Sequence, residues 1–142
     1  MSQSPEYVYK VFPSASVDSR IEGKANRGHR FYFPQPIPAS HEFFLCENDL
    51  QDGFVHMSTA EQVPGVLNRY FGDVPSVSIL RIDYGRLSAF KRVTWDQASN
   101  GEKYPHLHGF LEGESVDSFK EIEKGQNPTW DASLKTISDW LK

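Results

Sequence analysis

Two short segments of the chain hold the side chains whose types and spacing suit chemistry. The first, residues 52–64 (DGFVHMSTAEQVP), contains His56, Ser58 and Thr59. Its opening Asp-Gly predicts a turn, the next four residues predict a short strand, and Ser58 or Thr59 begins a predicted helix that continues through Phe71. Backbone N–H groups and the helix dipole favour an anion at such a strand-to-helix junction. We therefore expect this segment to form a wall of any phosphate or nucleotide pocket.

A purely structural explanation exists for each of these residues. Ser58 or Thr59, with Glu61 or Gln62 three residues later, is also the pattern of a capping box, which is needed only to start a helix. A lone histidine such as His56 on a short strand is often a satisfied structural residue. Both explanations stay open at the level of the sequence.

The second segment, residues 101–109 (GEKYPHLHG), contains Glu102, His106 and His108. His106 and His108 are two positions apart, so they share one face of a strand. Together with His56 they have the residue types of a catalytic zinc site, but the H-x-H spacing is not tied to one metal chemistry. Because four thiolate or imidazole ligands at recognised spacings are missing, we expect no structural zinc.

The same residues also suit an anionic ligand. Histidine donates to a ribose hydroxyl or a phosphate, or acts as an acid or base near neutral pH. A carboxylate such as Glu102 can stabilise a developing cationic sugar. The set predicted to surround the ligand is His56, Ser58, Thr59, Glu102 and His106.

Composition narrows the classes of function. A chain of 142 residues predicts one domain with a real core. The formal net charge of −4 argues against an electrostatic nucleic-acid binder. No apolar run is long enough to span a membrane. The single cysteine, Cys46, favours a reduced, cytoplasmic location. Because Cys46 lies in an apolar run, we expect its side chain to be packed in the core. Walker, G-x-G-x-x-G and G-x-S-x-G patterns are absent from the sequence.

The hydrophobic pattern predicts an α+β domain with a mixed or mainly antiparallel sheet. Strands are expected at 6–12, 77–83, 91–97, 104–110 and 116–123, helices at 14–23 and 130–142, and a turn at 84–87. The proline-rich stretch 24–40 is predicted to be irregular and contains a basic cluster. The side chains expected to be largely buried are Phe54, Ile79, Leu80, Ile82, Trp95 and Trp140.

Taken in order, these segments resemble the DUF952 family. Its pattern is an opening strand, DGFIHxSTxEQ, a hydrophobic strand, a W-E pair and GExFPHLYG. The corresponding segments here are DGFVHMSTAEQ, VSILRID, VTWD and GEKYPHLHG, so the resemblance covers about residues 7–119.

The resemblance implies an ADP-ribosyltransferase-like fold, in which a split sheet holds a nucleotide such as NAD. The implied reaction is cleavage of the nicotinamide–ribose bond with transfer to an acceptor. On this view His56 orients ribose or phosphate, Ser58 and Thr59 support the binding strand, Glu102 lies near the reacting sugar, and His106 forms a second polar wall.

Three positions depart from the family pattern. Lys10 replaces a histidine of the first strand, Asp96 replaces the glutamate of the W-E pair, and His108 replaces the tyrosine of PHLYG. Lys10 can bind phosphate, with Arg27 and Arg30 as possible helpers, but it cannot do neutral imidazole chemistry. Two alternatives therefore stand beside the transferase: a non-catalytic nucleotide- or ligand-binding module, and a metal-dependent hydrolase built on the histidines.

Overall fold

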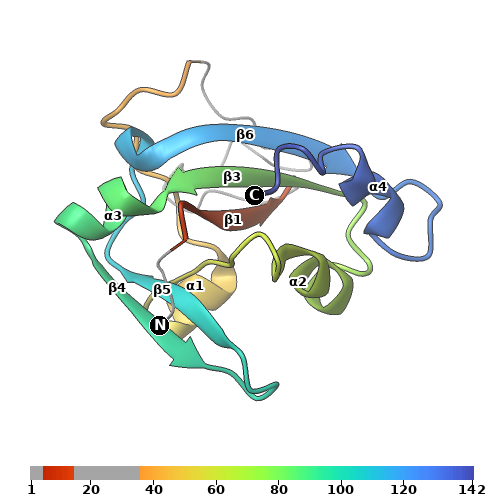
Figure 1. The fold of residues 1–142 in the computed structure, drawn as a ribbon, viewed down its shortest axis with the longest axis horizontal. Coiled ribbons are helices and arrows are strands. Elements are labelled where there is room, and N and C mark those ends of the chain that lie inside the picture. The colour runs from red at the N-terminus through yellow and green to blue at the C-terminus, as the bar shows by residue number, and fades with distance from the viewer. Residues whose placement is uncertain (1–4, 15–35) are drawn as a thin grey trace, which may run out of the picture.

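The computed structural model describes residues 5–14 and 36–142, which form two antiparallel three-stranded sheets with short helices (Figure 1). The first sheet has the order β1-β3-β6, with strands β1 (Tyr7–Pro13), β3 (Ser76–Asp83) and β6 (Val116–Glu123). The second sheet has the order β2-β5-β4, with strands β2 (Val55–His56), β5 (Lys103–His108) and β4 (Arg92–Gln97). This confirms the predicted α+β class with mainly antiparallel strands.

Strand β3 is the centre of the first sheet and is covered on both faces. Successive residues of a strand point to opposite faces, and here Ile79 and Leu80 are both 0% exposed. Leu80 packs in a cluster that includes Leu107 of the second sheet, whereas Ile79 packs in a cluster with Leu67 and Trp130. One face of the first sheet thus rests on the second sheet, and the other is covered by helices.

The two sheets are joined through the backbone of β1. Tyr9 and Ser58 form an isolated antiparallel bridge, in which each backbone N–H donates to the carbonyl of the other residue, at 2.7 and 2.8 Å. Within the second sheet, the N–H of Met57 donates to the carbonyl of Pro105 at 3.1 Å. The segment that follows β2 therefore leaves one sheet and meets the edge of the other.

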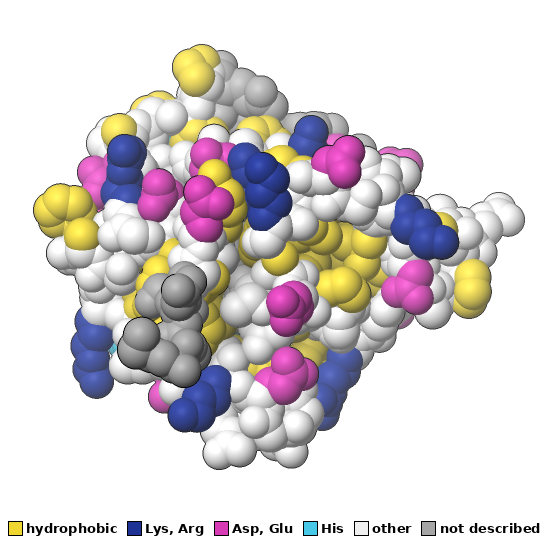
Figure 2. Space-filling model, in the orientation of Figure 1, with side chains coloured by type: hydrophobic (Ala, Val, Ile, Leu, Met, Phe, Trp, Pro, Cys, Tyr) yellow, Lys and Arg dark blue, Asp and Glu magenta, His cyan; other side chains and the backbone are white. Residues whose placement is uncertain are grey.

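The helices are α1 (Glu47–Asp52), α2 (Val63–Tyr70), α3 (Tyr84–Phe90), the 3₁₀ helix η1 (Gly113–Ser115) and α4 (Asp131–Lys135). No helix among the residues described here is long and apolar enough to cross a membrane. On the face drawn in Figure 2, acidic and basic side chains are interspersed, with apolar side chains between them.

The predicted start of the helix after β2 was wrong by several residues. Ser58 is used in the bridge to Tyr9, and the regular helix α2 begins only at Val63. The N–H of Thr59 donates to the side chain of Gln62 at 3.0 Å, which is one of the two bonds of the predicted capping box. Residues 60–62 form a turn between this capping bond and the regular helix.

Three other helix predictions also need correction. Residues 84–90 form α3 rather than a turn, because the Asp83 carboxylate accepts the N–H of Arg86 and caps a helix there. The C-terminal helix is limited to 131–135, and α1 was not predicted. The helix predicted at 14–23 and most of the stretch 24–40 lie outside the described residues.

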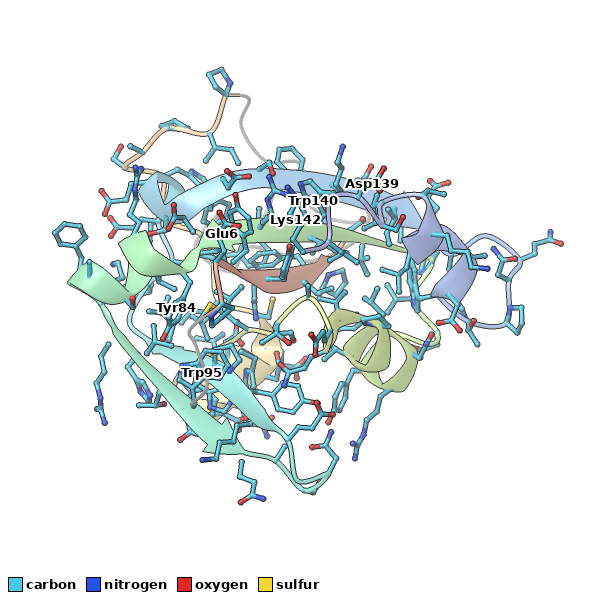
Figure 3. All side chains as sticks on the ribbon, viewed as in Figure 1. Glu6, Tyr84, Trp95, Asp139, Trp140 and Lys142 are labelled. Atoms are coloured by element: carbon cyan, nitrogen blue, oxygen red, sulfur yellow. The ribbon has the colours of Figure 1, made fainter. Side chains whose placement is uncertain are left out.

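The core also differs in part from the prediction. Ile79, Leu80 and Ile82 are fully buried, as predicted, but Phe54, Trp95 and Trp140 are only half-buried. Both tryptophans have polar partners for their indole N–H: Trp95 donates to the Tyr84 hydroxyl at 3.0 Å, and Trp140 donates to the Ser118 hydroxyl at 2.8 Å (Figure 3). The fully buried tryptophan is Trp130, which donates to a backbone carbonyl.

We expect Leu80→Ala to lower the free energy of unfolding by about 2–5 kcal/mol, because it leaves a cavity in a core that cannot close around it. Leu50 is 57% exposed, so Leu50→Ala serves as the matched control and should change stability by less than about 0.5 kcal/mol. Urea denaturation followed by tryptophan fluorescence measures both. Equal losses in the two variants would contradict this placement of β3.

Candidate functional site

A buried carboxylate, Asp49 of α1, organises one end of the candidate site. It is 1% exposed and accepts two hydrogen bonds from the ammonium of Lys10, at 2.7 and 3.0 Å. It also accepts the backbone N–H groups of His56 at 3.0 Å and Cys46 at 3.2 Å. Gly53, at a φ of 83°, ends α1 and turns the chain so that His56 comes back to Asp49. One carboxylate thus connects β1, α1 and β2.

The sequence analysis missed Asp49, although Lys10 gave a signal for it. Lys10 is 3% exposed in a strand whose neighbours are all apolar, and a buried ammonium needs a charged partner. No feature of the sequence around Asp49 singled it out as that partner.

His56 is held through both nitrogens of its ring. Nδ1 lies 2.7 Å from Oδ1 of Asp49, and Nε2 lies 2.9 Å from Oδ2 of Asp52. Because ionised carboxylates only accept hydrogen bonds, the ring makes both bonds at once only in its doubly protonated form. The imidazole of His56 is therefore anchored between two acids.

His106 lies directly opposite His56 in the β2–β5 pairing, and the two ring centroids are 5.4 Å apart. Its Nδ1 lies 2.7 Å from Oδ2 of Asp96, a residue of the neighbouring strand β4. The ring also stacks on Phe54, with centroids 4.1 Å apart. The structure thus brings the two predicted histidines together, one from each sequence segment.

The electrostatics of these groups follow from their partners. Burial by itself would raise the pKa of Asp49, but the hydrogen bond from His56 and the charge of Lys10 outweigh it and lower that pKa. Burial lowers the pKa of His106, and the hydrogen bond to Asp96 opposes this only in part. Burial raises the pKa of the half-buried Cys46 thiol to about 11, so it is no thiolate nucleophile at neutral pH.

Both histidines line a cleft of about 1240 Å³. Its walls come from β1, α1, the β2 segment, the end of α2, the loop before β3 and part of β5. Most of the lining side chains are apolar or aromatic, among them Phe44, Leu50, Phe71 and Tyr104. A concave, mostly apolar site with a few convergent polar groups is typical of small-molecule binding.

The other predicted site residues have different surroundings. Lys10 and Ser58 line the cleft, but the ammonium of Lys10 is held by Asp49, and Ser58 is 5% exposed. Among the described residues that line the cleft, Thr59 and Glu102 do not appear. Glu102 lies on the exposed β4–β5 turn, 3.5 Å from the side-chain nitrogen of Asn100.

The three histidines are not arranged as metal ligands. Within residues 5–14 and 36–142, no group of three or more His, Cys, Asp or Glu side chains is placed to hold a metal ion. The ring of His108 instead contacts the Thr94 hydroxyl at 2.8 Å. The metal-dependent hydrolase therefore has no geometric support.

Comparisons with known proteins agree with the resemblance seen in the sequence. Residues 37–119, more than half of the chain, match the family described as "Protein of unknown function (DUF952)". No curated protein matches the chain.

Two solved structures of protein CC0527 from Caulobacter crescentus have a similar fold. The crystal structure has a TM-score of 0.65 at 20% identity, covering 91% of this chain and 98% of that one. The solution NMR structure has a TM-score of 0.62 at 20% identity, covering 96% and 97%. At this identity the similarity concerns the fold alone. From the family match, the chain belongs to the DUF952 family.

Removing Asp49 should destabilise the protein strongly, because it leaves the Lys10 ammonium buried without a partner. We expect Asp49→Ala to cost about 3–5 kcal/mol of unfolding free energy, measured by urea denaturation. Asp52→Ala is the control, since the Asp52 side chain is 48% exposed, and should cost less than about 1 kcal/mol. The double variant Lys10→Met/Asp49→Leu should recover much of the loss; no recovery would contradict a dominant role of the ion pair.

The stabilising effect of Asp49 should also depend on pH. Because the folded protein lowers the pKa of Asp49, its contribution is fully present above the ordinary aspartate pKa of about 3.9 and is lost as pH falls through the lowered value. The difference in stability between the wild type and Asp49→Asn should therefore shrink below about pH 4. Denaturation at a series of acidic pH values tests this, and a difference independent of pH would refute it.

Proposed function

We propose that this DUF952 protein binds a small molecule in the cleft between its two sheets, with a phosphate-bearing nucleotide such as NAD as the candidate ligand. One observation carries the proposal: His56 and His106 lie side by side, with ring centroids 5.4 Å apart, on the wall of a cleft of about 1240 Å³. A cleft of this size is large enough for a cofactor-sized ligand.

Several features support a nucleotide. Aromatic side chains in the lining, such as Phe54 and Tyr104, suit stacking on a base or a pyridine ring. Nε2 of His106, which has no partner among the described residues, suits a hydrogen bond from a ribose hydroxyl. The lining also contains the carboxylates of Glu47, Asp52 and Asp73, which repel phosphate. Affinity for phosphate must therefore come from individual hydrogen-bond donors of the cleft wall. Arg27 and Arg30, the proposed helpers, lie outside the described residues.

The finer proposal is an ADP-ribosyltransferase-like enzyme of the cytoplasm, and it rests on the family resemblance. In that reaction the bond between ribose and nicotinamide breaks, the electron pair leaves with nicotinamide, and an acceptor adds to the cationic sugar. Glu102 does not line the cleft, whereas Asp52 lines it and is hydrogen-bonded to His56. We therefore assign to Asp52, rather than Glu102, the carboxylate beside the sugar.

A non-catalytic binding module is the second candidate, and a specific observation favours it. Lys10, which replaces the first-strand histidine of the family, has its ammonium bound to Asp49. Both ring nitrogens of His56 are also bound to carboxylates. On this view the family pocket is kept for ligand binding, and turnover is lost.

Calorimetric titration with NAD, ADP-ribose and adenosine tests the proposal. We expect the two phosphate-bearing ligands to bind more tightly than the nucleoside. His56→Ala should weaken their binding by about 1–3 kcal/mol, because the variant leaves the Asp52 carboxylate in the cleft wall without its imidazole partner, where it repels phosphate. His108→Ala is the control, because His108 is on the same strand as His106 but bonds to Thr94.

No heat with any phosphate ligand, or equal affinity for adenosine, would refute the nucleotide pocket. Chromatography that measures nicotinamide released from NAD distinguishes the transferase from the non-catalytic binding module. Steady release that is lost in Asp52→Asn supports the transferase, whereas tight binding without release supports the binding module.

A further inference from the structure

We propose that Asp96 and His106 form a proton-accepting pair in the cleft, in which Asp96 orients the ring and Nε2 of His106 takes a proton from a hydroxyl group of the bound ligand. This deepens the proposed function and rests on the cleft being the ligand site. It assigns the acid–base role to His106 and leaves His56 as a ring held in place by Asp49 and Asp52.

The β4–β5 pairing fixes the geometry of this pair. Thr94 lies directly opposite His106, and Asp96, two residues further along β4, is on the same face of the sheet. The carboxylate Oδ2 of Asp96 lies 2.7 Å from Nδ1 of His106 and also accepts the Thr94 hydroxyl at 2.7 Å. Since a carboxylate only accepts, Nδ1 carries the hydrogen, and the lone pair of the neutral ring is on Nε2.

Nε2 of His106 is available to a ligand. Among the described residues, none makes a hydrogen bond to this atom, and the ring is part of the cleft wall. The His106 side chain is only 13% exposed, and its ring is stacked on Phe54. Packing and Asp96 together therefore hold one nitrogen toward the protein and leave the other for a ligand.

Both ring nitrogens of His56 already have protein partners. Its side chain is more exposed, at 29%, but carboxylates of Asp49 and Asp52 lie 2.7 and 2.9 Å from its two nitrogens. These two contacts leave neither ring nitrogen of His56 open to a ligand. Of the two cleft histidines, only His106 combines an orienting acid with an open nitrogen.

The charges around His106 suit a base near neutral pH. The titratable groups facing it are Asp96 from β4, His56 from β2 and His108 from β5. Burial lowers the pKa of His106, the charge and hydrogen bond of Asp96 oppose that effect, and the net change favours the neutral ring. In the step itself the ligand O–H bond breaks, the electron pair stays on oxygen, and the proton forms a new N–H bond at Nε2. Asp96 then stabilises the imidazolium.

The test uses diethyl pyrocarbonate on the free protein. An imidazole nitrogen with a free lone pair attacks one carbonyl of this reagent, which releases ethanol and carbon dioxide and leaves an ethoxycarbonyl group on the ring. Fragment mass spectrometry then follows each histidine at pH 7. If side-chain exposure set the rates, His56 would react first, whereas the proposal predicts that His106 reacts several times faster than His56. Faster labelling of His56 would overturn the proposal.

Two variants of Asp96 separate orientation from charge. In Asp96→Ala, ¹⁵N–¹H correlation NMR should show His106 moving from the Nδ1–H form toward the Nε2–H form, with slower labelling. In Asp96→Asn, whose side-chain oxygen still accepts from Nδ1, the Nδ1–H form should persist. Asp52→Ala is the matched control and should leave the tautomer of His106 unchanged. An unchanged tautomer in Asp96→Ala would overturn the proposal.

These measurements need no ligand, so the pair and the nucleotide are tested separately. Failure of nucleotides to bind would refute the proposed function and leave the labelling result standing. Normal nucleotide binding with His56 labelled first would refute the pair alone.

Discussion

The burial of Lys10 is the constraint on which the rest of the site depends. Transferring an ammonium out of water costs several kcal/mol unless a charged partner and further hydrogen bonds compensate, and Asp49 is that partner, at 2.7 Å. The same carboxylate accepts N–H groups at the start of α1 and at His56. The Asp49 carboxylate thus ties β1, which is distant in the sequence, to α1 and β2, and the position of the His56 ring follows from that arrangement.

The cleft follows from the way the two sheets meet. Strand β1 pairs with β3 along its whole length, but its other edge meets the segment after β2 at the isolated bridge of Tyr9 and Ser58. Lys10 follows Tyr9 directly, so the buried ion pair lies beside this junction. Because the cleft is lined from both sides of the junction, the histidines of the second sheet face the same space as residues of β1.

The strands could be predicted because alternating apolar and aromatic residues mark them directly. Helices α2 and α4 were predicted in place but with wrong bounds, whereas α1 and α3 were not predicted as helices. Ser58 is taken up by a backbone pairing with β1 that only the fold creates, so α2 begins later than predicted. Residues 47–52 (ENDLQD) lack the apolar periodicity of a helix. In the site, the sequence motifs predicted His56 and His106, which the structure places side by side, whereas their acids, Asp49 and Asp96, depended on tertiary pairing.

Two positions that differ from the family pattern, Lys10 and Asp96, both take part in the hydrogen bonding of the candidate site. Lys10, at the position where the family pattern has a first-strand histidine, donates to the buried carboxylate of Asp49. Asp96, in place of the family's glutamate, is still long enough to contact Nδ1 of His106 at 2.7 Å, because the β4–β5 register places both side chains on one face. Lys10 is thus part of a fixed charge pair, and Asp96 orients the imidazole of His106. Of the two histidines that line the cleft, His106 is therefore the one whose second ring nitrogen has no protein partner among the described residues.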